Sequence, residues 1–343
     1  MLLFLLACGS PPPPPQTEPA ADVTLERVTP PSPTIPAVDI QADLHLDTPT
    51  QLLRRKVGLE APGLEAGLPQ LRAGGTNLAV MVLWPPREAD WEGTVQRLIA
   101  SVEAEDQRLE GLLRVGEPAE ARRAAAEGKV GYFYSLEGAH GIDRSGVAGL
   151  EALHGKGLRM LGLTWSFSNR FAGSSADGGG GLTEAGRELV VAANRLNILL
   201  DLSHASRATT LETCALSTDP VLASHSDAAA IQPNARNLSD EELRCICDGG
   251  GVVGLNFHAP FVGKGASLAR VAEHAAHIRA VGGAGCVALG SDFDGLIHVP
   301  PELPDASALP ALWAELQRQG WTKDELQGFR GGNFMRLWGK VRQ

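Results

Sequence analysis

Residues 43–49 read Asp43-Leu44-His45-Leu46-Asp47-Thr48-Pro49 and close an alternation of apolar and polar residues that begins at Val38. The alternation predicts a β-strand with its apolar side chains on one face and its polar side chains on the other. Pro49 cannot donate to a ladder, so the strand is expected to end there. His45 and Asp47 then leave the end of the strand in one direction, where an imidazole and a carboxylate can bind one divalent metal ion. An ordinary strand with one solvated face would show the same pattern, so this stretch alone does not establish a metal site.

The composition is typical of a globular α/β protein. The chain has 343 residues, 43% of them hydrophobic, with 40 Gly and 23 Pro, which suits one large domain or two small ones. The formal net charge is -10 and no run of basic residues occurs, so nucleic acid is not expected as a partner.

The N-terminal residues predict export and anchoring. The apolar run over 1–8 is too short to span a bilayer and lacks the basic flank of a usual signal peptide. Leu5-Leu6-Ala7-Cys8-Gly9 is nevertheless similar to a bacterial lipobox, in which the cysteine becomes the lipidated N-terminus. We therefore expect a lipoprotein-type signal over 1–8, a Pro-rich tether over 9–36, and a protein anchored in the bacterial cell envelope by lipid on Cys8. The alternative is a misassigned start codon in front of an unrelated apolar stub.

Eight short apolar runs follow the tether, and stretches with helical periodicity separate them. The runs cover 38–47, 77–84, 130–136, 159–165, 198–202, 220–224, 251–257 and 286–290. Continuous apolar runs of this length are typical of parallel strands covered on both faces. Their number and the chain length favour a single (β/α)8 TIM-type barrel over 37–343. An open doubly wound sheet would usually carry a Gly-rich phosphate loop after its first strand, where this chain has Thr48-Pro49-Thr50.

Helices are expected between the runs. They are predicted over 94–112, 118–127, 146–156, 184–196 with Thr183 as the cap, 205–216, from Ser239 onward, 268–281, and 308–341 with breaks at Gly320 and Gly331-Gly332. The connection over 52–71 is predicted as helical or irregular.

Histidines and acidic residues stand at the ends of five of the eight runs. They are His45 and Asp47, then Glu137 and His140, then His204, then His225, then Asp292 and Asp294. In a barrel the C-terminal strand ends surround one mouth, where enzymes of this fold place their chemistry. One zinc ion needs only three protein ligands, whereas this set is large enough for two. Glu137 is the expected bridge, and two metal ions roughly 3.5–4 Å apart can share a hydroxide and polarise a carbonyl.

At these residues the chain resembles the membrane dipeptidase (renal dipeptidase) family, peptidase family M19, of the amidohydrolase barrel superfamily. The resemblance runs from about Asp39 to Trp338, and its motifs occur in the family's order. They are Asp43-Leu44-His45-Leu46-Asp47-Thr48-Pro49, Glu137-Gly138-Ala139-His140, Asp201-Leu202-Ser203-His204, Ser224-His225-Ser226, Arg236-Asn237-Leu238, Gly290-Ser291-Asp292-Phe293-Asp294-Gly295 and Gly331-Gly332-Asn333-Phe334.

The resemblance implies a zinc-dependent dipeptidase that hydrolyses free dipeptides with a hydroxide bridging two zinc ions. His45, Asp47 and Glu137 would hold one zinc ion. Glu137, His204 and His225 would hold the other, so that Glu137 bridges. Small dipeptides are the implied partners, and a homodimer is compatible with this family.

Three further residues receive roles from the resemblance. Arg236 would bind the substrate's C-terminal carboxylate, because a guanidinium fork suits a carboxylate. Asp292 would be catalytic, by accepting the nucleophile's proton, handing it to the leaving amine, or holding the substrate ammonium. The family's fourth strand often ends in Leu-Thr-His, with the His touching substrate, whereas this chain has Leu163-Thr164-Trp165. Trp165 cannot be charged as a His can, and it is expected to contact substrate as an aromatic at the mouth.

Two other functions compete with the dipeptidase interpretation. One is a different barrel amidohydrolase that cleaves an N-acyl amino acid, a lactam or a phosphoester. Many such relatives begin with His-x-His and bridge with a modified Lys, so His45-x-Asp47 with Glu137 argues against them. The other is a metal-binding but inactive surface lipoprotein, and the retention of every expected ligand argues against it.

The remaining cysteines and polar residues receive structural predictions. An exported protein could form a disulfide among Cys214, Cys245, Cys247 and Cys286, but their spacing does not indicate which would pair. Buried free thiols are the expected state. Four histidines are expected to be solvated: His154, His274, His277 and His298. Four residues are placed near the mouth: His140 shaping the loop after Glu137, His258 as a candidate for the lining, and Asp201 and Asp294 orienting the ligands.

Overall fold

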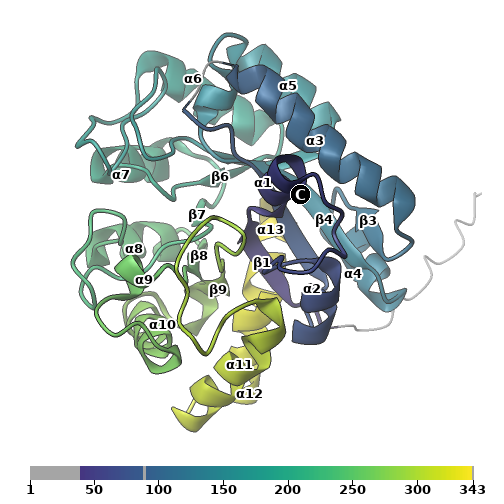
Figure 1. The fold of residues 1–343 in the computed structure, drawn as a ribbon. Helices are drawn as coiled ribbons and strands as arrows, with labels where there is room; N and C mark the ends of the chain where they lie inside the picture. The colour runs from purple at the N-terminus through teal and green to yellow at the C-terminus, as the bar shows by residue number, and fades with distance from the viewer. Residues whose placement is uncertain (1–38, 88–89, 342–343) are drawn as a thin grey trace, which may run out of the picture. The chain divides into compact units, whose positions relative to one another are not determined.

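The computed structural model describes residues 39–87 and 90–341, which belong to one compact unit covering 35–343. The predicted signal, the predicted tether and Cys8 lie outside the described residues. Eight parallel strands pair in sequence order and are surrounded by helices (Figure 1). They are β1 (Ala42–Leu46), β2 (Leu78–Leu83), β4 (Val130–Leu136), β5 (Leu158–Gly162), β6 (Leu199–Asp201), β7 (Leu222–Ala223), β8 (Val252–Leu255) and β9 (Val287–Leu289).

The sheet closes between its last and first strands. Leu46 forms an isolated parallel bridge with Phe293, just past the end of β9. The backbone N–H of Asp47 donates to the Phe293 carbonyl at 2.9 Å, and that of Asp292 donates to the His45 carbonyl at 3.1 Å. The predicted (β/α)8 TIM-type barrel is therefore confirmed, and each of the eight predicted apolar runs overlaps one of its strands.

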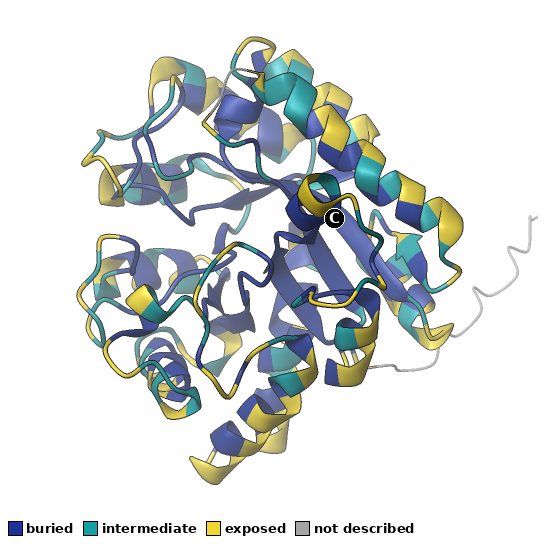
Figure 2. Ribbon diagram, in the orientation of Figure 1, coloured by how far each residue is buried: buried dark blue, intermediate teal, exposed yellow. Residues whose placement is uncertain are grey.

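The helices cover the outside of the barrel, and their exposed residues lie on the faces that point away from the strands (Figure 2). They are α1 (Thr48–Arg55), α2 (Leu68–Gly74), α3 (Trp91–Arg108), α4 (Pro118–Ala126), α5 (Gly146–Gly155), α6 (Glu184–Arg195), α7 (Arg207–Leu216), α8 (Asp240–Asp248), α9 (Ala259–Val262), α10 (Leu268–Gly282), α11 (Leu309–Arg318), α12 (Lys323–Gln327) and α13 (Asn333–Val341). Thr183 caps α6 and Ser239 caps α8, as predicted. Across the described ranges, no helix combines the length and apolarity needed to cross a bilayer.

The helix predicted over 94–112 is too long at its C-terminal end. α3 stops at Arg108, and Leu112 begins β3 (Leu112–Arg114), which pairs with β4 alone, beside the barrel. A strand of three residues with only its first residue buried has too short an apolar run to be recognised from sequence.

A packed apolar layer fills the barrel below its mouth. One buried cluster contains at least one residue from each of the eight barrel strands, together with Phe334, Leu337 and Trp338 of α13. Only inward-facing residues of all eight strands can meet in this way. The Asn333 amide at the start of α13 donates to the Ala284 and Val287 carbonyls, both at 2.8 Å, where β9 begins. α13 therefore closes the end of the barrel opposite to the C-terminal strand ends.

The faces predicted for β1 are wrong beyond its first residues. Ala42 and Leu44 belong to the cluster inside the barrel, whereas Leu46 belongs to the cluster outside it. The pairing of β1 with β2 shifts register between Asp43 and Leu46, as in a β-bulge, and a bulge reverses which residues point inward. Adjacent residues of a regular strand point to opposite faces, but the irregularity lets both Leu44 and His45 point into the barrel. His45 thereby reaches the mouth.

The cysteines form two disulfides, so the prediction of free thiols is wrong. Cys214 of α7 pairs with Cys245 of α8, and Cys247 of α8 pairs with Cys286, which directly precedes β9. The paired Cα atoms lie 6.1 and 5.4 Å apart, within the usual range for a disulfide. The partners are 31 and 39 residues apart, so only the packing of α7, α8 and β9 reveals them.

The prediction of a solvated His274 is also wrong. Its side chain is fully buried in α10, where Nδ1 accepts from the Ala228 N–H at 3.1 Å and Nε2 donates to the Val262 carbonyl at 3.0 Å. These bonds support the segment that follows β7. The other histidines of that prediction are half-buried (His154, His277) or exposed (His298).

Candidate metal centre and substrate cavity

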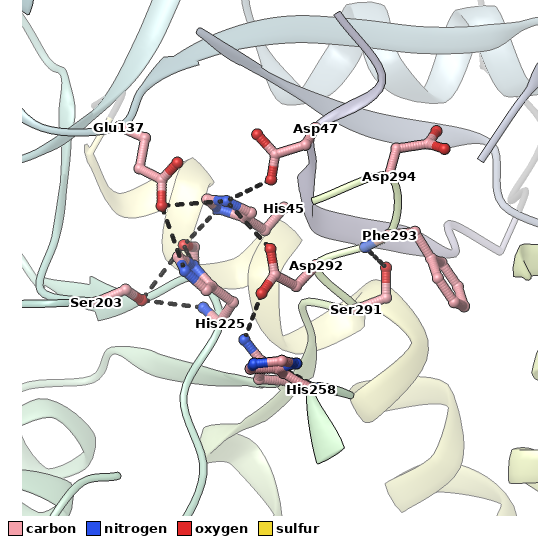
Figure 3. Close-up of polar contacts among 12 residues, drawn as sticks. His45, Asp47, Glu137, Ser203, His225, His258, Ser291, Asp292, Phe293 and Asp294 are labelled. Carbon is pink, nitrogen blue, oxygen red and sulfur yellow. Dashed lines mark hydrogen bonds and ion pairs between the residues drawn. The ribbon is translucent and has the colours of Figure 1, made fainter. Parts of the chain in front are cut away.

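The five predicted metal ligands lie together at the mouth of the barrel, and all five are buried. His45 lies in β1 and Asp47 directly follows it, Glu137 follows β4, and His204 and His225 follow β6 and β7. The view in Figure 3 shows most of this cluster.

The first group of possible ligands surrounds the Nε2 atom of His45. This atom lies 3.6 Å from Oδ2 of Asp47 and 3.7 Å from Oε1 of Glu137. Oδ1 of Asp292 is 3.9 Å away. His45, Asp47 and Glu137 are thus close enough to ligate one cation, as are His45, His225 and Asp292.

The second group shares Glu137 with the first. Its Oε1 atom lies 2.9 Å from Nε2 of His204 and 3.7 Å from Nε2 of His225. The two Nε2 atoms are 3.1 Å apart. Glu137, His204 and His225 therefore form a second set of ligand atoms that could hold one cation, and Glu137 is common to both sets.

The residues present fit divalent metal ions. In each histidine of the two sets, Nδ1 contacts a serine hydroxyl and Nε2 points to the shared centre. Nε2 of His45 and Oδ1 of Asp47 are buried and have no hydrogen-bond partner among the residues that the structure describes. Orphaned buried polar atoms are costly, and a cation between them would satisfy both. Hydroxyl contacts at Nδ1 are the usual way in which metal-binding imidazoles are oriented.

The electrostatics of the centre also favour bound metal ions. Burial raises the pKa of Glu137 well above its ordinary value, against the attraction of His45. Burial likewise raises the pKa of Asp292 to about 7, against the attraction of His45. Burial lowers the pKa of His45, but the carboxylates of Glu137 and Asp47 outweigh it and raise that pKa to about 10. Crowded buried carboxylates of this kind call for positive charge, which metal ions would supply.

The other two histidines of the centre, His204 and His225, favour the neutral form. Burial lowers the pKa of His204 well below its ordinary value, with Arg236 contributing. Burial and the neighbouring His45 do the same for the pKa of His225. Neutral imidazoles are the form that binds a metal ion.

A cavity of about 330 Å³ opens above these ligands. Trp84 and Trp165 form one wall, with ring centroids 5.1 Å apart. His258 and Phe261 line the cavity as well, together with the exposed Leu296. The structure therefore places Trp165 and His258 at the mouth. Trp84 and Phe261 were missed, although Trp84 could have been noticed as the last residue of the second apolar run.

Arg236 lies in the cavity lining with only 8% of its surface exposed. Its guanidinium donates to Oγ of Ser226 at 3.3 Å and to the His225 carbonyl at 3.1 Å, and it lies over the Phe261 ring. Its Nε is buried without a partner, and it forms no ion pair within the described residues. A buried guanidinium in this condition can receive an anionic group from a ligand.

Asp292 stands between the two metal groups and the cavity. Its Oδ2 accepts from the Asn256 amide at 2.9 Å, and its backbone φ of 66° lies in the left-handed region. Such a conformation is uncommon for residues other than Gly and often marks a functional position. Asn256 was missed in the sequence, where it is a single polar residue near the end of the run over 251–257.

The residues predicted to orient the ligands differ in what they contact. Asp201 binds the hydroxyl of Ser224, which contacts two of the histidines. Asp294 instead accepts from Thr48 Oγ1 at 2.8 Å and from the Glu65 N–H at 2.8 Å, and so ties loops at the mouth together. His140 is buried, with Nε2 2.9 Å from the Pro85 carbonyl, and packs after Glu137.

Comparison with known proteins agrees with this site. The family model of membrane dipeptidases, peptidase family M19, matches residues 35–343. The chain is 36% identical over 221 residues to dipeptidase aclJ of Aspergillus oryzae (strain ATCC 42149 / RIB 40), over 62% of this chain and 52% of that protein. This chain thus spans about half the length of that relative.

Solved structures with the same fold cover nearly the whole of the folded part. A dipeptidase AC, a metallopeptidase of family M19, has a TM-score of 0.81 at 29% identity, over 88% of this chain and 98% of that one. A metallopeptidase from Rhodobacter sphaeroides, liganded with a phosphinate mimic of the dipeptide L-Ala-D-Ala, has a TM-score of 0.82 at 28% identity, over 88% of this chain and 99% of that one. The barrel, its paired ligand sets and the extent of the family match show that this chain belongs to the membrane dipeptidase family, peptidase family M19.

Proposed function

We propose that this protein hydrolyses the peptide bond of free dipeptides, with two zinc ions held by the two ligand sets that share Glu137. The observation that carries the proposal is that these two sets share one small cavity with the buried guanidinium of Arg236, which forms no ion pair with any described residue. A metal centre that shares its cavity with a carboxylate-binding group suits a short peptide with a free C-terminus. The relative bound to a dipeptide mimic supports the same substrate class.

The chain's own residues have distinct tasks in this proposal. Bound metal ions would activate water as a nucleophile at neutral pH and polarise the peptide carbonyl. Arg236 would hold the C-terminal carboxylate and so fix the position of the scissile bond. Asp292 would accept the nucleophile's proton and return it to the leaving amine, with its orientation set by Asn256. Trp84 and Trp165 would wall the cavity against bulk water.

The two disulfides bear on where the protein works. Disulfides form and persist in oxidising compartments such as the bacterial periplasm, and are rare in the cytosol. Cys214–Cys245 and Cys247–Cys286 therefore support our proposal that the protein resides in the cell envelope. The lipobox-like stretch around Cys8 is the separate basis for proposing a lipid anchor there.

The first prediction tests the activity and its metal requirement. Purified protein should bind two zinc equivalents and hydrolyse members of a dipeptide library, because each ligand set would hold one ion. A chelator should abolish the activity and zinc should restore it, and His204→Ala should lose most of it. Elemental analysis that finds one metal ion or none after zinc reconstitution, or hydrolysis that survives chelation, would contradict the proposal.

The second prediction concerns Arg236. Replacing a dipeptide by its C-terminal amide leaves the buried guanidinium without its partner, so kcat/KM should fall by the equivalent of about 2–5 kcal/mol. Arg236→Met should cause a similar loss with the free dipeptide and a much smaller further loss with the amide. Steady-state kinetics of both enzymes on both substrates provide the control. Equal turnover of the dipeptide and its amide by the unaltered protein would exclude this role for Arg236.

The third prediction concerns Trp165. Trp165→Phe keeps a ring but removes the indole N–H, so kcat/KM should fall about 10-fold or less, the scale of one neutral hydrogen bond. Trp165→Ala should cost more, because it also removes the contact with the Trp84 ring. Neither variant should change the pH profile, since Trp does not titrate, whereas Trp165→His should add an ionisation near pH 6.5. If both truncations match the parent on every dipeptide tried, Trp165 does not contact substrate.

The fourth prediction concerns anchoring. Cys8 should carry lipid in the bacterial cell, and Cys8→Ser should release the protein from the membrane fraction without loss of dipeptidase activity, because the site lies in the barrel. Cell fractionation and mass spectrometry of the N-terminus provide the measurement. A soluble protein that retains unmodified Met1 would rule the anchor out.

A further inference from the structure

A single serine hydroxyl contacts the histidines of both ligand sets. Oγ of Ser224 lies 3.1 Å from Nδ1 of His45, which belongs to the first set. It also lies 2.8 Å from Nδ1 of His225, which belongs to the second set. Ser224 is fully buried, so water does not compete for these contacts.

The direction of each hydrogen bond follows from the third partner of this hydroxyl. Oγ of Ser224 lies 2.5 Å from Oδ2 of Asp201, and a carboxylate oxygen can only accept. The other oxygen of Asp201 already accepts from the N–H groups of Ser203 at 3.0 Å and Ser224 at 2.7 Å. The one proton of the hydroxyl is therefore given to Asp201. Its two lone pairs remain, one for each imidazole.

An imidazole that donates from Nδ1 keeps its lone pair on Nε2. His45 and His225 must therefore each carry their hydrogen on Nδ1 when both contact Ser224, which leaves both Nε2 atoms free to bind metal. The negative charge of Asp201 also reaches both imidazoles through the one hydroxyl and favours donation by both. Oγ of Ser203 lies 3.4 Å from Oγ of Ser224 and accepts from the backbone N–H of His225 at 3.0 Å, so it does not contact either imidazole nitrogen in this way.

The third histidine is oriented independently of this hydroxyl. Nδ1 of His204 lies 3.3 Å from Oγ of Ser166, which lines the cavity and follows β5. Ser166 contacts neither of the other two histidines by hydrogen bond within the described residues. The chain thus offers two serines of similar chemistry, of which one serves both ligand sets and the other serves only the second.

We propose that Ser224, with Asp201 behind it, is a shared positioning residue that sets the tautomer and orientation of one histidine in each metal set, so that both metal affinities depend on one hydroxyl. This inference rests on the metal centre of the proposed function. A metal-binding histidine that loses the hydrogen-bond partner of its other ring nitrogen typically binds the metal about 10- to 100-fold more weakly. Loss of Ser224 would impose that penalty twice, whereas loss of Ser166 would impose it once.

The test is a zinc titration of the full-length protein in competition with a chromogenic chelator, which reads both binding steps without substrate. Ser224→Ala should shift both steps to about 10- to 100-fold higher free zinc. Asp201→Asn should also shift both, because its amide would donate to the hydroxyl and turn the hydroxyl proton toward an imidazole. Ser166→Ala is the matched control and should shift one step only. Thermal unfolding of the metal-free proteins checks that each variant is folded, and Asp201→Asn keeps the side-chain volume if Ser224→Ala does not fold.

Three results would overturn the inference. The first is that Ser224→Ala and Asp201→Asn leave both binding steps unchanged. The second is that they shift only one step. The third is that Ser166→Ala shifts both steps equally. That result would mean that the two zinc-binding steps depend on each other through the shared Glu137 and not through Ser224. If zinc binding depends on Ser224 but the protein does not hydrolyse dipeptides, this inference stands and the proposed function is rejected. If the protein hydrolyses dipeptides but zinc binding does not depend on Ser224, the proposed function stands and this inference is rejected.

Discussion

The closure between β9 and β1 is the contact on which the rest of the site depends. Backbone bonds join Asp47 to Phe293 and Asp292 to His45 at the mouth, and the Asp43 carboxylate accepts from the Ser291 N–H at 3.0 Å. The ligands of β1 lie on one side of this seam and Asp292 lies on the other. The backbone bonds that close the barrel therefore also bring Oδ1 of Asp292 to 3.9 Å from Nε2 of His45. The same contacts thus stabilise the fold and position the residues of the site.

Much of this arrangement could be predicted because barrel strands are covered on both faces. Such strands are continuous apolar runs, and all eight were recognisable in the sequence. The position of a residue after a run then predicts its place at the mouth, whatever the exact pairing. The sequence alone therefore predicts the positions of four ligands at the mouth: His45, Glu137, His204 and His225. The family match over 35–343 agrees with the same motifs.

The features that escaped prediction depend on contacts between distant segments. The register shift in β1 changes which residues point inward, yet the sequence around Leu44 alternates perfectly. The disulfides join residues from separate elements of the fold, and no spacing rule indicates the partners. Ser224 and Asn256 act through neighbours that only the fold supplies, since a serine before a histidine is common and a lone asparagine in an apolar run is ambiguous. The local sequence pattern predicts helices and strands. The register shift, the disulfides and the partners of Ser224 and Asn256 depend on how distant segments pack together.

The two disulfides enclose the loops that carry much of the site. The covalent ring closed by Cys214 and Cys245 contains both His225 and Arg236, and the next ring begins two residues later at Cys247. A protease that cuts the backbone once inside either ring leaves the two pieces covalently joined. A nicked molecule therefore keeps its substrate-binding loop attached to the barrel until a thiol reductant arrives. In a compartment rich in proteases and poor in reductants, such an arrangement would extend the working life of the protein beyond the first cut in its chain.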